Sequence, residues 1–464
     1  MAITLWVHIL WLTAVAIFLA FLTYTTYQLL SGYVRKWYEM KPIPGVAGAY
    51  PIIGHALQFK ANAGDFFSQI IEGTNEFRHL PLLKLWVGPV PFIVLFHAET
   101  IEMVLNNPKH LDKSYAYRFL YPWLGTGLLT STGDKWRRRR KMLTPTFHFS
   151  ILTDFLEVMN EQAEVLTEKL EKRAGGGLFN CFSFITLCAL DIICETAMGK
   201  KIYAQNNSDS EYVQSVYKMS DIISRRQRTP WYWPDFIYYF LGEGREHNRR
   251  LKILHSFTES VIRERAESVR HVDSDREPEE GPRKRRAFLD MLLKSTDEEG
   301  RALSHRDIQE EVDTFMFEGH DTTAASLNWT LYLLGSHPEE QRKVQQELQE
   351  VFDGFKVPEG VNAVIIPYAL HRDPRHFPDP EDFRPERFSP ENSEGRNPFA
   401  FIPFSGGVRN CIGQRFALME EKVVLAWLLR RFAVRSCQTR DDLRPLGGLV
   451  LRPEKGIWIR LERR

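Results

Sequence analysis

Cysteine is scarce in this sequence, and its spacing matches no common metal or disulfide pattern. The 464 residues contain an odd number of cysteines with no C-x-x-C pair among them: Cys181, Cys188, Cys194, Cys411 and Cys437. This spacing argues against a disulfide framework and against a cysteine-rich zinc site. We therefore expect the folded part of the chain to lie in a reducing compartment.

Net charge is also nearly absent. Sixty Lys and Arg residues face 59 Asp and Glu residues, which leaves a formal charge of +1. Because the charges are so nearly balanced, the protein has no overall field that would hold a nucleic acid or steer an acidic substrate. Any electrostatic partner must therefore meet a local patch. The 44% of hydrophobic residues excludes wholesale disorder.

The N-terminal segment lacks ionised side chains. Met1 to Val34 contains no Asp, Glu, Lys or Arg, and its apolar run from Ile3 to Leu22 has the length that a helix needs to cross a bilayer. A cleaved signal peptide would need a basic start and a small-residue cleavage site, and neither is evident. Since Arg35 and Lys36 follow the apolar run, we predict a single transmembrane helix with the rest of the chain in the cytosol.

Three parts are predicted along the chain: a transmembrane anchor over 1–34, a basic and proline-rich hinge over 35–54, and one large domain over 55–464. Helix dominates the domain, with amphipathic runs at 149–172, 247–269, 304–334 and 338–352. Strand patterns are short and lie at 82–87, 92–96, 362–369, 448–451 and 456–461. The charged stretch 273–286 is expected to be a solvated loop.

One cysteine stands among glycines. Phe404-Ser-Gly-Gly-Val-Arg-Asn-Cys-Ile-Gly413 is followed by a helical pattern from Gln414 to Leu429. A thiolate at a helix N-terminus is stabilised by free N–H groups, and glycines let the backbone approach a large planar group. These are the requirements of an axial haem ligand. On this geometry alone, a buried structural cysteine in a glycine loop remains an alternative for Cys411.

A polar group of residues interrupts the predicted helix at 304–334. Glu318, Asp321 and Thr322 stand at i, i+3 and i+4, so they share one helical face. Gly319 costs ~1 kcal/mol relative to alanine inside a helix, which suggests a purpose such as room for a flat ligand. A hydroxyl beside a carboxylate can relay protons. Polar residues that satisfy one another between packed helices remain the alternative.

A basic run occupies Lys135 to Lys141, with five consecutive basic residues from Arg137. A nucleic-acid interpretation is available for such a run, but the membrane segment argues against it. Trp136 and Arg140 stand at i and i+4 and can project together toward carboxylates. Arg137 to Arg139 would then form a basic face for a partner, or a merely solvated helix face.

The residues from Phe404 to Gly413 match F-x-x-G-x-R-x-C-x-G and so resemble the haem-binding signature of the cytochrome P-450 superfamily. The chain most resembles the V subfamily of its family 4, the fatty-acid omega-hydroxylases. This resemblance implies the cytochrome P-450 fold, mainly α with small β-sheets, and a haem monooxygenase of the endoplasmic reticulum membrane. The implied reaction hydroxylates fatty acids at or near the omega carbon with O2 and NADPH-derived electrons. The implied partners are membrane lipid, NADPH-cytochrome P-450 reductase and, optionally, cytochrome b5, but no nucleic acid.

The resemblance also implies roles for particular residues. Cys411 would be the metal ligand, Asp321 and Thr322 would act in proton delivery, and Glu318 would esterify a haem methyl. The other cofactor-binding residues would be Phe404, Gly407 and Gly413 beside the thiolate and the haem, and Trp136, Arg140 and Arg409 at its propionates.

The pattern breaks once. An E-x-x-R helix of the family is expected between Phe352 and Val357, but the chain passes directly from Gly354 to Phe355, so several dozen residues are absent. Arg387 of the P-E-R-F element would lose its partners there, at a cost of ~3–5 kcal/mol if it is buried. Two hypotheses therefore stand: a working monooxygenase, and a non-catalytic or unstable variant of the same family.

Overall fold

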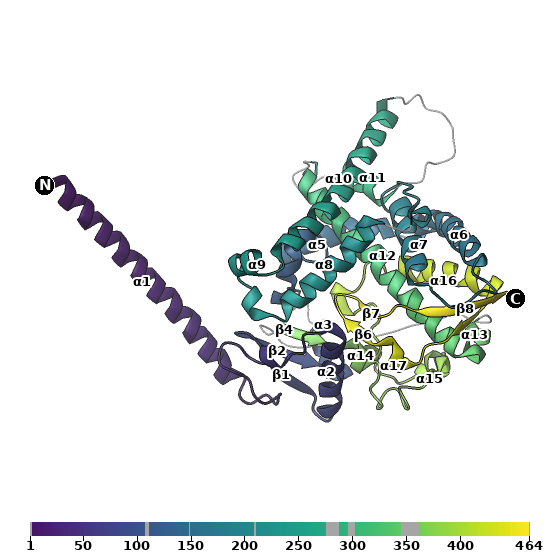
Figure 1. The fold of residues 1–464 in the computed structure, drawn as a ribbon, viewed down its shortest axis with the longest axis horizontal. Helices are drawn as coiled ribbons and strands as arrows, with labels where there is room; N and C mark the ends of the chain where they lie inside the picture. Colours follow the sequence, from purple (N-terminus) through teal and green to yellow (C-terminus); the bar gives the residue numbers. More distant parts are fainter. Residues whose placement is uncertain are drawn as a thin grey trace.

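The computed structural model describes residues 2–106, 111–147, 149–207, 210–274, 287–295, 302–344 and 362–463. A long helix projects from a body built of helices and small sheets (Figure 1). The described helices are α1 (Ala2–Glu39), α2 (Ala63–Glu76), α3 (Ala98–Leu105), α4 (Tyr121–Leu124), α5 (Gly133–Leu143), α6 (Phe149–Glu171), α7 (Phe182–Thr196), α8 (Glu211–Gln227), α9 (Asp235–Leu241), α10 (Gly244–Ser274), α11 (Phe288–Lys294), α12 (His305–Ser336), α13 (Pro338–Val344), α14 (Pro367–Leu370), α15 (Pro390–Ser393), α16 (Gln414–Arg431) and α17 (Arg440–Leu443).

The projecting helix α1 is long and apolar enough to cross a membrane. Its segment His8–Glu39 contains an 18-residue window with a mean hydropathy of 1.9, and no part of that window is buried in the rest of the protein. The helix continues to Glu39, so the predicted hinge at 35–54 begins inside it rather than after it. A turn follows at residues 40–42 and a bend at residue 43.

Aromatic packing explains why the helix continues. The rings of Tyr33 and Trp37 lie 5.4 and 5.1 Å from that of Trp86 in β1. The Tyr33 hydroxyl also accepts a hydrogen bond from the backbone N–H of Ile52, at 3.1 Å. The last two turns of α1 therefore pack on the body of the protein, and the boundary predicted at residue 34 falls inside this contact.

The first sheet has the strand order β1-β2-β4. Its hairpin of β1 (Leu82–Val87) and β2 (Val90–Leu95) confirms the two strands predicted around Gly88. Strand β4 (Asn362–Ile365) joins β2 in parallel. The strand predicted over 362–369 is too long, because Pro367 begins α14.

Two smaller sheets lie toward the C-terminus. One has the order β3-β8-β5, with β3 (Phe179–Asn180), β8 (Trp458–Arg463) and β5 (Phe432–Ser436). The other is a hairpin of β6 (Pro445–Gly447) and β7 (Leu451–Pro453). The strand predicted over 448–451 is thus shifted toward the C-terminus, and the one over 456–461 corresponds to β8.

The long helices that the periodicity predicts are confirmed at α6, α10, α12 and α16. Ser304 caps α12, because its side chain accepts a hydrogen bond from the N–H of Asp307. Of the helix predicted over 338–352, α13 is present and residues 345–352 lie outside the described residues, as do residues 275–286 of the predicted loop.

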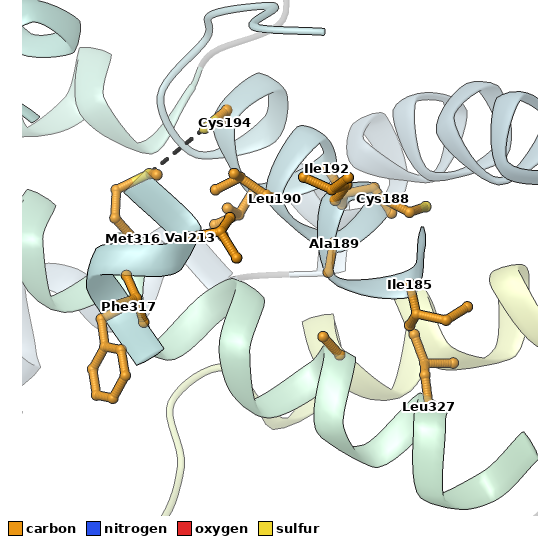
Figure 2. Packing of buried hydrophobic residues seen from close by; sticks show 14 of the residues in the cluster. Ile185, Cys188, Ala189, Leu190, Ile192, Cys194, Val213, Met316, Phe317 and Leu327 are labelled. Atoms are coloured by element: carbon orange, nitrogen blue, oxygen red, sulfur yellow. Dashed lines mark hydrogen bonds between the residues drawn. The ribbon is translucent and has the colours of Figure 1, made fainter. Parts of the chain in front are cut away.

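Helices α12 and α7 pack closely in the centre of the main hydrophobic core (Figure 2). The Met316 and Cys194 sulfur atoms lie 3.8 Å apart across this interface. A Cβ atom on Gly319 would lie 2.6 Å from the Ile193 side chain. Gly319 therefore serves helix packing, which corrects the interpretation that its missing side chain makes room for a flat ligand.

Candidate functional site

The loop before α16 holds Cys411 in a defined shape. The N–H of Cys411 donates to the carbonyl of Phe404 at 3.0 Å, and the N–H of Asn410 donates to that of Gly407 at 3.1 Å. Gly407 has a φ of +64°, and a Cβ atom there would collide with the Leu105 carbonyl. Gly407 thus fits the loop onto α3.

Cys411 differs from the core cysteines in its surroundings. Cys181, Cys188 and Cys194 are buried, and burial raises the pKa of Cys181 to about 12. Cys411 is exposed. Partial desolvation raises the pKa of its thiol, while the backbone N–H of Gly413 and the charge of Arg140 lower it. The pKa of the thiol is raised overall, so the Gly413 N–H and Arg140 favour the thiolate that would bind a metal against the effect of burial.

The three residues predicted at the propionates lie around this loop. Arg140 donates to the backbone carbonyl and side-chain oxygen of Asn410, at 2.7 and 2.9 Å. The Arg409 guanidinium lies 4.4 Å from the ring centre of buried Trp136 and donates to the carbonyl of Ser131 at 3.1 Å. Burial lowers the pKa of Arg409 to about 10. The structure therefore brings two cations next to Cys411.

Glu318 lies close enough to Cys411 that its charge raises the pKa of the thiol. Burial raises the pKa of Glu318 itself to about 7, and the charge of Lys113 opposes that rise. Burial and the charge of Arg409 lower the pKa of Lys113 to about 8. Lys113 lies before α4 and belongs to no motif, so sequence reasoning could not single it out.

Asp321 and Thr322 do not lie in the same environment. Thr322 is exposed and its hydroxyl donates to the carbonyl of Glu318 at 2.6 Å. Asp321 is buried and forms a close ion pair with Arg452 of β7. The two residues are adjacent on α12, but their surroundings differ, because Asp321 turns toward the C-terminal hairpin. Arg452 is a second residue that sequence reasoning missed.

Two side chains of the basic run from Lys135 to Lys141 form ion pairs within the protein. Arg139 is buried and forms an ion pair with Asp307 of α12. Lys135 donates to Glu310 of the same helix at 2.8 Å. These contacts join α5 to α12, so Arg139 does not belong to the basic face expected over Arg137 to Arg139.

Arg387 binds backbone carbonyls instead of the side chains of an E-x-x-R helix. Its guanidinium donates to the backbone carbonyls of Pro378, Asp379 and Asp382 in the loop that precedes it. The group is partly exposed, so the cost expected for a buried, unpaired arginine does not apply. The break between Gly354 and Phe355 lies outside the described residues.

The residues around Cys411 fit a haem held by a thiolate. The described residues contain no group of three His, Cys, Asp or Glu side chains that could hold a metal ion by themselves. One accessible thiol with Arg140 and Arg409 beside it suits a planar iron complex that carries acidic groups.

Comparison with known families agrees with this chemistry. The sequence model of the cytochrome P450 family matches residues 44–356 and 351–460. The chain therefore belongs to the cytochrome P450 family, the class of haem monooxygenases that the fold and the cysteine loop define.

Individual relatives place it more narrowly, in family 4. The chain is 56% identical to cytochrome P450 4V2 of Rattus norvegicus over 487 positions, which cover 94% of this chain and 93% of that protein. It is 55% identical to the Homo sapiens protein of the same name over 507 positions, covering 98% and 97%. Cytochrome P450 4c3 of Drosophila melanogaster is 43% identical over 480 positions, covering 91% and 89%.

Proposed function

We propose that this chain is a membrane-anchored monooxygenase that hydroxylates fatty acids at or near the omega carbon. The observation that carries the proposal is the accessible Cys411 thiol, held at the start of α16 with Arg140 and Arg409 beside it. The proposed domain limits are an anchor at 1–34, a hinge at 35–54 and a catalytic domain at 55–464. Trp37, which packs on Trp86 together with Tyr33 of the anchor, lies in the hinge.

Each site residue has a proposed task. Bound haem would supply activated oxygen, and Cys411 would hold its iron. Arg140 and Arg409 would bind the propionates. The Trp136 ring would hold the Arg409 guanidinium in place through their cation–π contact. Phe404 closes the cysteine loop through its carbonyl, Gly407 lets the loop pack on Leu105, and Gly413 leaves the space beside the Cys411 sulfur without a side chain. Thr322 would pass protons to the oxygen. Asp321, the next residue of α12, would supply those protons.

The proposed location is the endoplasmic reticulum membrane, with the body on the cytosolic side. Helix α1 supports this proposal through its length and composition. Electrons would come from NADPH through NADPH-cytochrome P-450 reductase, with cytochrome b5 as an optional second partner. Arg137 and Lys141 are exposed on α5 and could contact an acidic partner, whereas buried Arg139 could not.

A second candidate is a variant of the family that does not form a working haem pocket. The family match is divided into two pieces that meet at residues 351–356. The alignment with the human relative spans 507 positions, more than the 464 residues of this chain, so that protein has residues with no counterpart here. Both observations favour an absent segment near Gly354, where the E-x-x-R helix is expected.

The reduced carbon monoxide difference spectrum distinguishes the two candidates. We expect purified full-length chain to give the absorbance band of a thiolate-ligated haem, and we expect Cys411→Ala to lose that band. Cys437→Ala is the matched control, because Cys437 is the other exposed cysteine among the described residues. The monooxygenase proposal fails if the unaltered chain takes up haem without this band, or if Cys411→Ala retains it.

A further inference from the structure

A small pocket with two arginines lies between the end of α2, the short helix α14 and the loop that precedes the P-E-R-F element. Its volume is about 220 Å³. Pockets that hold whole small molecules usually measure roughly 300–1,000 Å³. The described lining contains Arg78 and Arg372 and a single acidic residue, Glu381. A pocket of this size and charge suits a small anionic group rather than a whole organic molecule.

Arg78 is held in the pocket by neutral groups. Its Nη1 atom donates to the backbone carbonyls of Ala369 and Arg372, at 3.4 and 3.3 Å, and its Nη2 atom donates to the side chain of Asn75 at 3.1 Å. Burial lowers the pKa of Arg78, and the charge of Asp373 opposes that effect. The guanidinium is therefore fixed in position by dipoles, and its charge remains attractive to an anion.

Arg372 has a buried donor without a partner. Its guanidinium lies 3.7 Å from the ring centre of Tyr368, and its Nη1 atom donates to the carbonyl of the same residue at 3.3 Å. The Nε atom is buried and has no hydrogen-bond partner in the described part of the chain. An oxygen of Glu381 lies 3.5 Å from this atom, in a geometry that makes no hydrogen bond. Because buried donors are nearly always paired in folded proteins, this atom is suited to a ligand.

Glu381 is shared between two arginines. Its Oε2 atom forms a close ion pair with Arg440 of α17, and the Nη2 atom of Arg440 also donates to the Tyr368 hydroxyl at 2.8 Å. One carboxylate therefore faces two guanidiniums, those of Arg440 and Arg372. Since a single negative charge cannot neutralise both, positive charge is in excess at this pocket.

A second carboxylate near the pocket is bound by a different arginine. Asp373 is buried and pairs with Arg375 at 2.6 Å. Burial lowers the pKa of Arg372, Tyr368 opposes that effect, and the charge of Arg440 adds to it. The guanidiniums that line the pocket are thus left with less negative charge than they could hold.

We propose that this pocket binds a phosphate group, with its oxygens on the guanidiniums of Arg78 and Arg372. Guanidiniums bind phosphate through paired, charge-assisted hydrogen bonds, and a phosphate monoester carries close to two negative charges at neutral pH. One oxygen would accept from the Nε of Arg372, while Arg440 keeps Glu381. Inorganic phosphate and the headgroup of phosphatidic acid offer the same chemistry. The described lining contains none of the residues proposed to hold haem, so the inference requires neither haem nor turnover.

Arginine modification of the full-length chain in phosphatidylcholine nanodiscs tests the proposal. Phenylglyoxal reacts with guanidiniums, and mass spectrometry reads the adduct at each arginine separately. The Arg372 side chain is 30% exposed, so the reagent can reach it. We expect saturating inorganic phosphate to slow modification of Arg372 about tenfold relative to sodium chloride of equal ionic strength, because a bound phosphate occupies the donors. Arg384 is exposed, lies outside the described lining and should react at an unchanged rate.

Two substitutions are expected to act in opposite directions on the phosphate concentration that half-protects Arg372. Arg78→Met removes a charged donor and should raise that concentration about tenfold. Glu381→Gln removes the competing carboxylate and should lower it severalfold. Arg384→Met is the matched control and should leave it unchanged.

Nanodiscs that contain phosphatidic acid, with no added phosphate, distinguish the two sources of the ligand. Protection of Arg372 in these discs supports a lipid headgroup, whereas protection by inorganic phosphate alone supports a soluble ligand. Absence of protection by both sources overturns the proposal, and so does equal slowing at Arg372 and Arg384. Because these comparisons use the unaltered chain, they decide the matter even if Arg78→Met does not fold. A folded Arg78→Met with an unchanged half-protecting concentration would also contradict the proposal.

Discussion

Burial shifts the pKa values of Glu318 and Lys113 toward neutrality from opposite sides. Burial raises the pKa of the carboxyl to about 7 and lowers that of the amine to about 8. The charge of each group opposes the effect of burial on the other, so the two charged forms stabilise one another. Removing either one is expected to shift the titration of its neighbour.

We predict that Glu318 becomes esterified to haem during turnover, and that the yield increases with pH. The reacting form is the carboxylate, which predominates only above about pH 7. In chain that binds haem, the fraction resisting acid-acetone extraction should therefore be larger after turnover at pH 8 than at pH 6. Glu318→Ala should release all of the haem at both values, and retention in that variant would exclude Glu318 as the attachment residue.

His371 supports a second prediction, on stability in acid. Burial lowers the pKa of this imidazole to about 4, and its Nε2 accepts the N–H of Ile402 at 3.0 Å. Since the folded state holds the ring neutral, its contribution is complete above pH 6.5 and is lost as the pH falls toward 4. The shift corresponds to roughly 3 kcal/mol.

The measurement is chemical denaturation of the full chain at pH 7 and pH 4.5. His371→Gln, whose amide oxygen can accept the same N–H, should reduce the loss of stability between these values. His79→Gln changes an exposed histidine and should not. An equal loss of stability in all three proteins would show that His371 does not control acid sensitivity.

At this scale the sequence identified the residues around Cys411 but not their partners. The glycine loop, Trp136, Arg140 and Arg409 belong to short local patterns, and the structure brings them together. The partner of Asp321 is 131 residues away in a hairpin without a motif. Pairings between distant segments leave no local signal, so Arg452 could not be predicted.

At the scale of elements, the aromatic contact of α1 supports a prediction about the anchor. Tyr33 packs on Trp86 and binds Ile52, so Tyr33→Ala should lower the stability of the full chain by about 1–2 kcal/mol. Tyr27→Ala is the matched control, because this tyrosine lies on the same helix but is exposed. Thermal unfolding in nanodiscs measures both. Equal melting temperatures for the two variants would show that the contact contributes nothing.

Elements with strong periodicity were predictable, and those set by neighbours were not. The limits of α6 and α12 follow from the apolar period and, for α12, the cap at Ser304. The continuation of α1 to Glu39 depends on Trp86, and the packing role of Gly319 depends on Ile193. Periodicity shows which face of a helix is buried but not which side chain lies opposite.

For the whole molecule, the divided family match leads to a prediction of rescue. We expect that inserting the corresponding segment of the rat relative between Gly354 and Phe355 increases the thiolate-type carbon monoxide band severalfold per mole of protein. An inserted Gly/Ser linker of equal length is the control, since it restores spacing but neither the E-x-x-R pair nor the pocket wall. Equal bands from the two insertions would show that the missing segment does not limit haem binding.

The contact of Tyr33 and Trp37 with Trp86 also affects how the molecule meets others. Because these rings join the body to its membrane helix, α1 in a bilayer restricts the height and tilt of the body. Any partner held in the same bilayer then approaches by lateral diffusion and finds the same surface at the same level each time. The search for that partner is reduced from three dimensions to two.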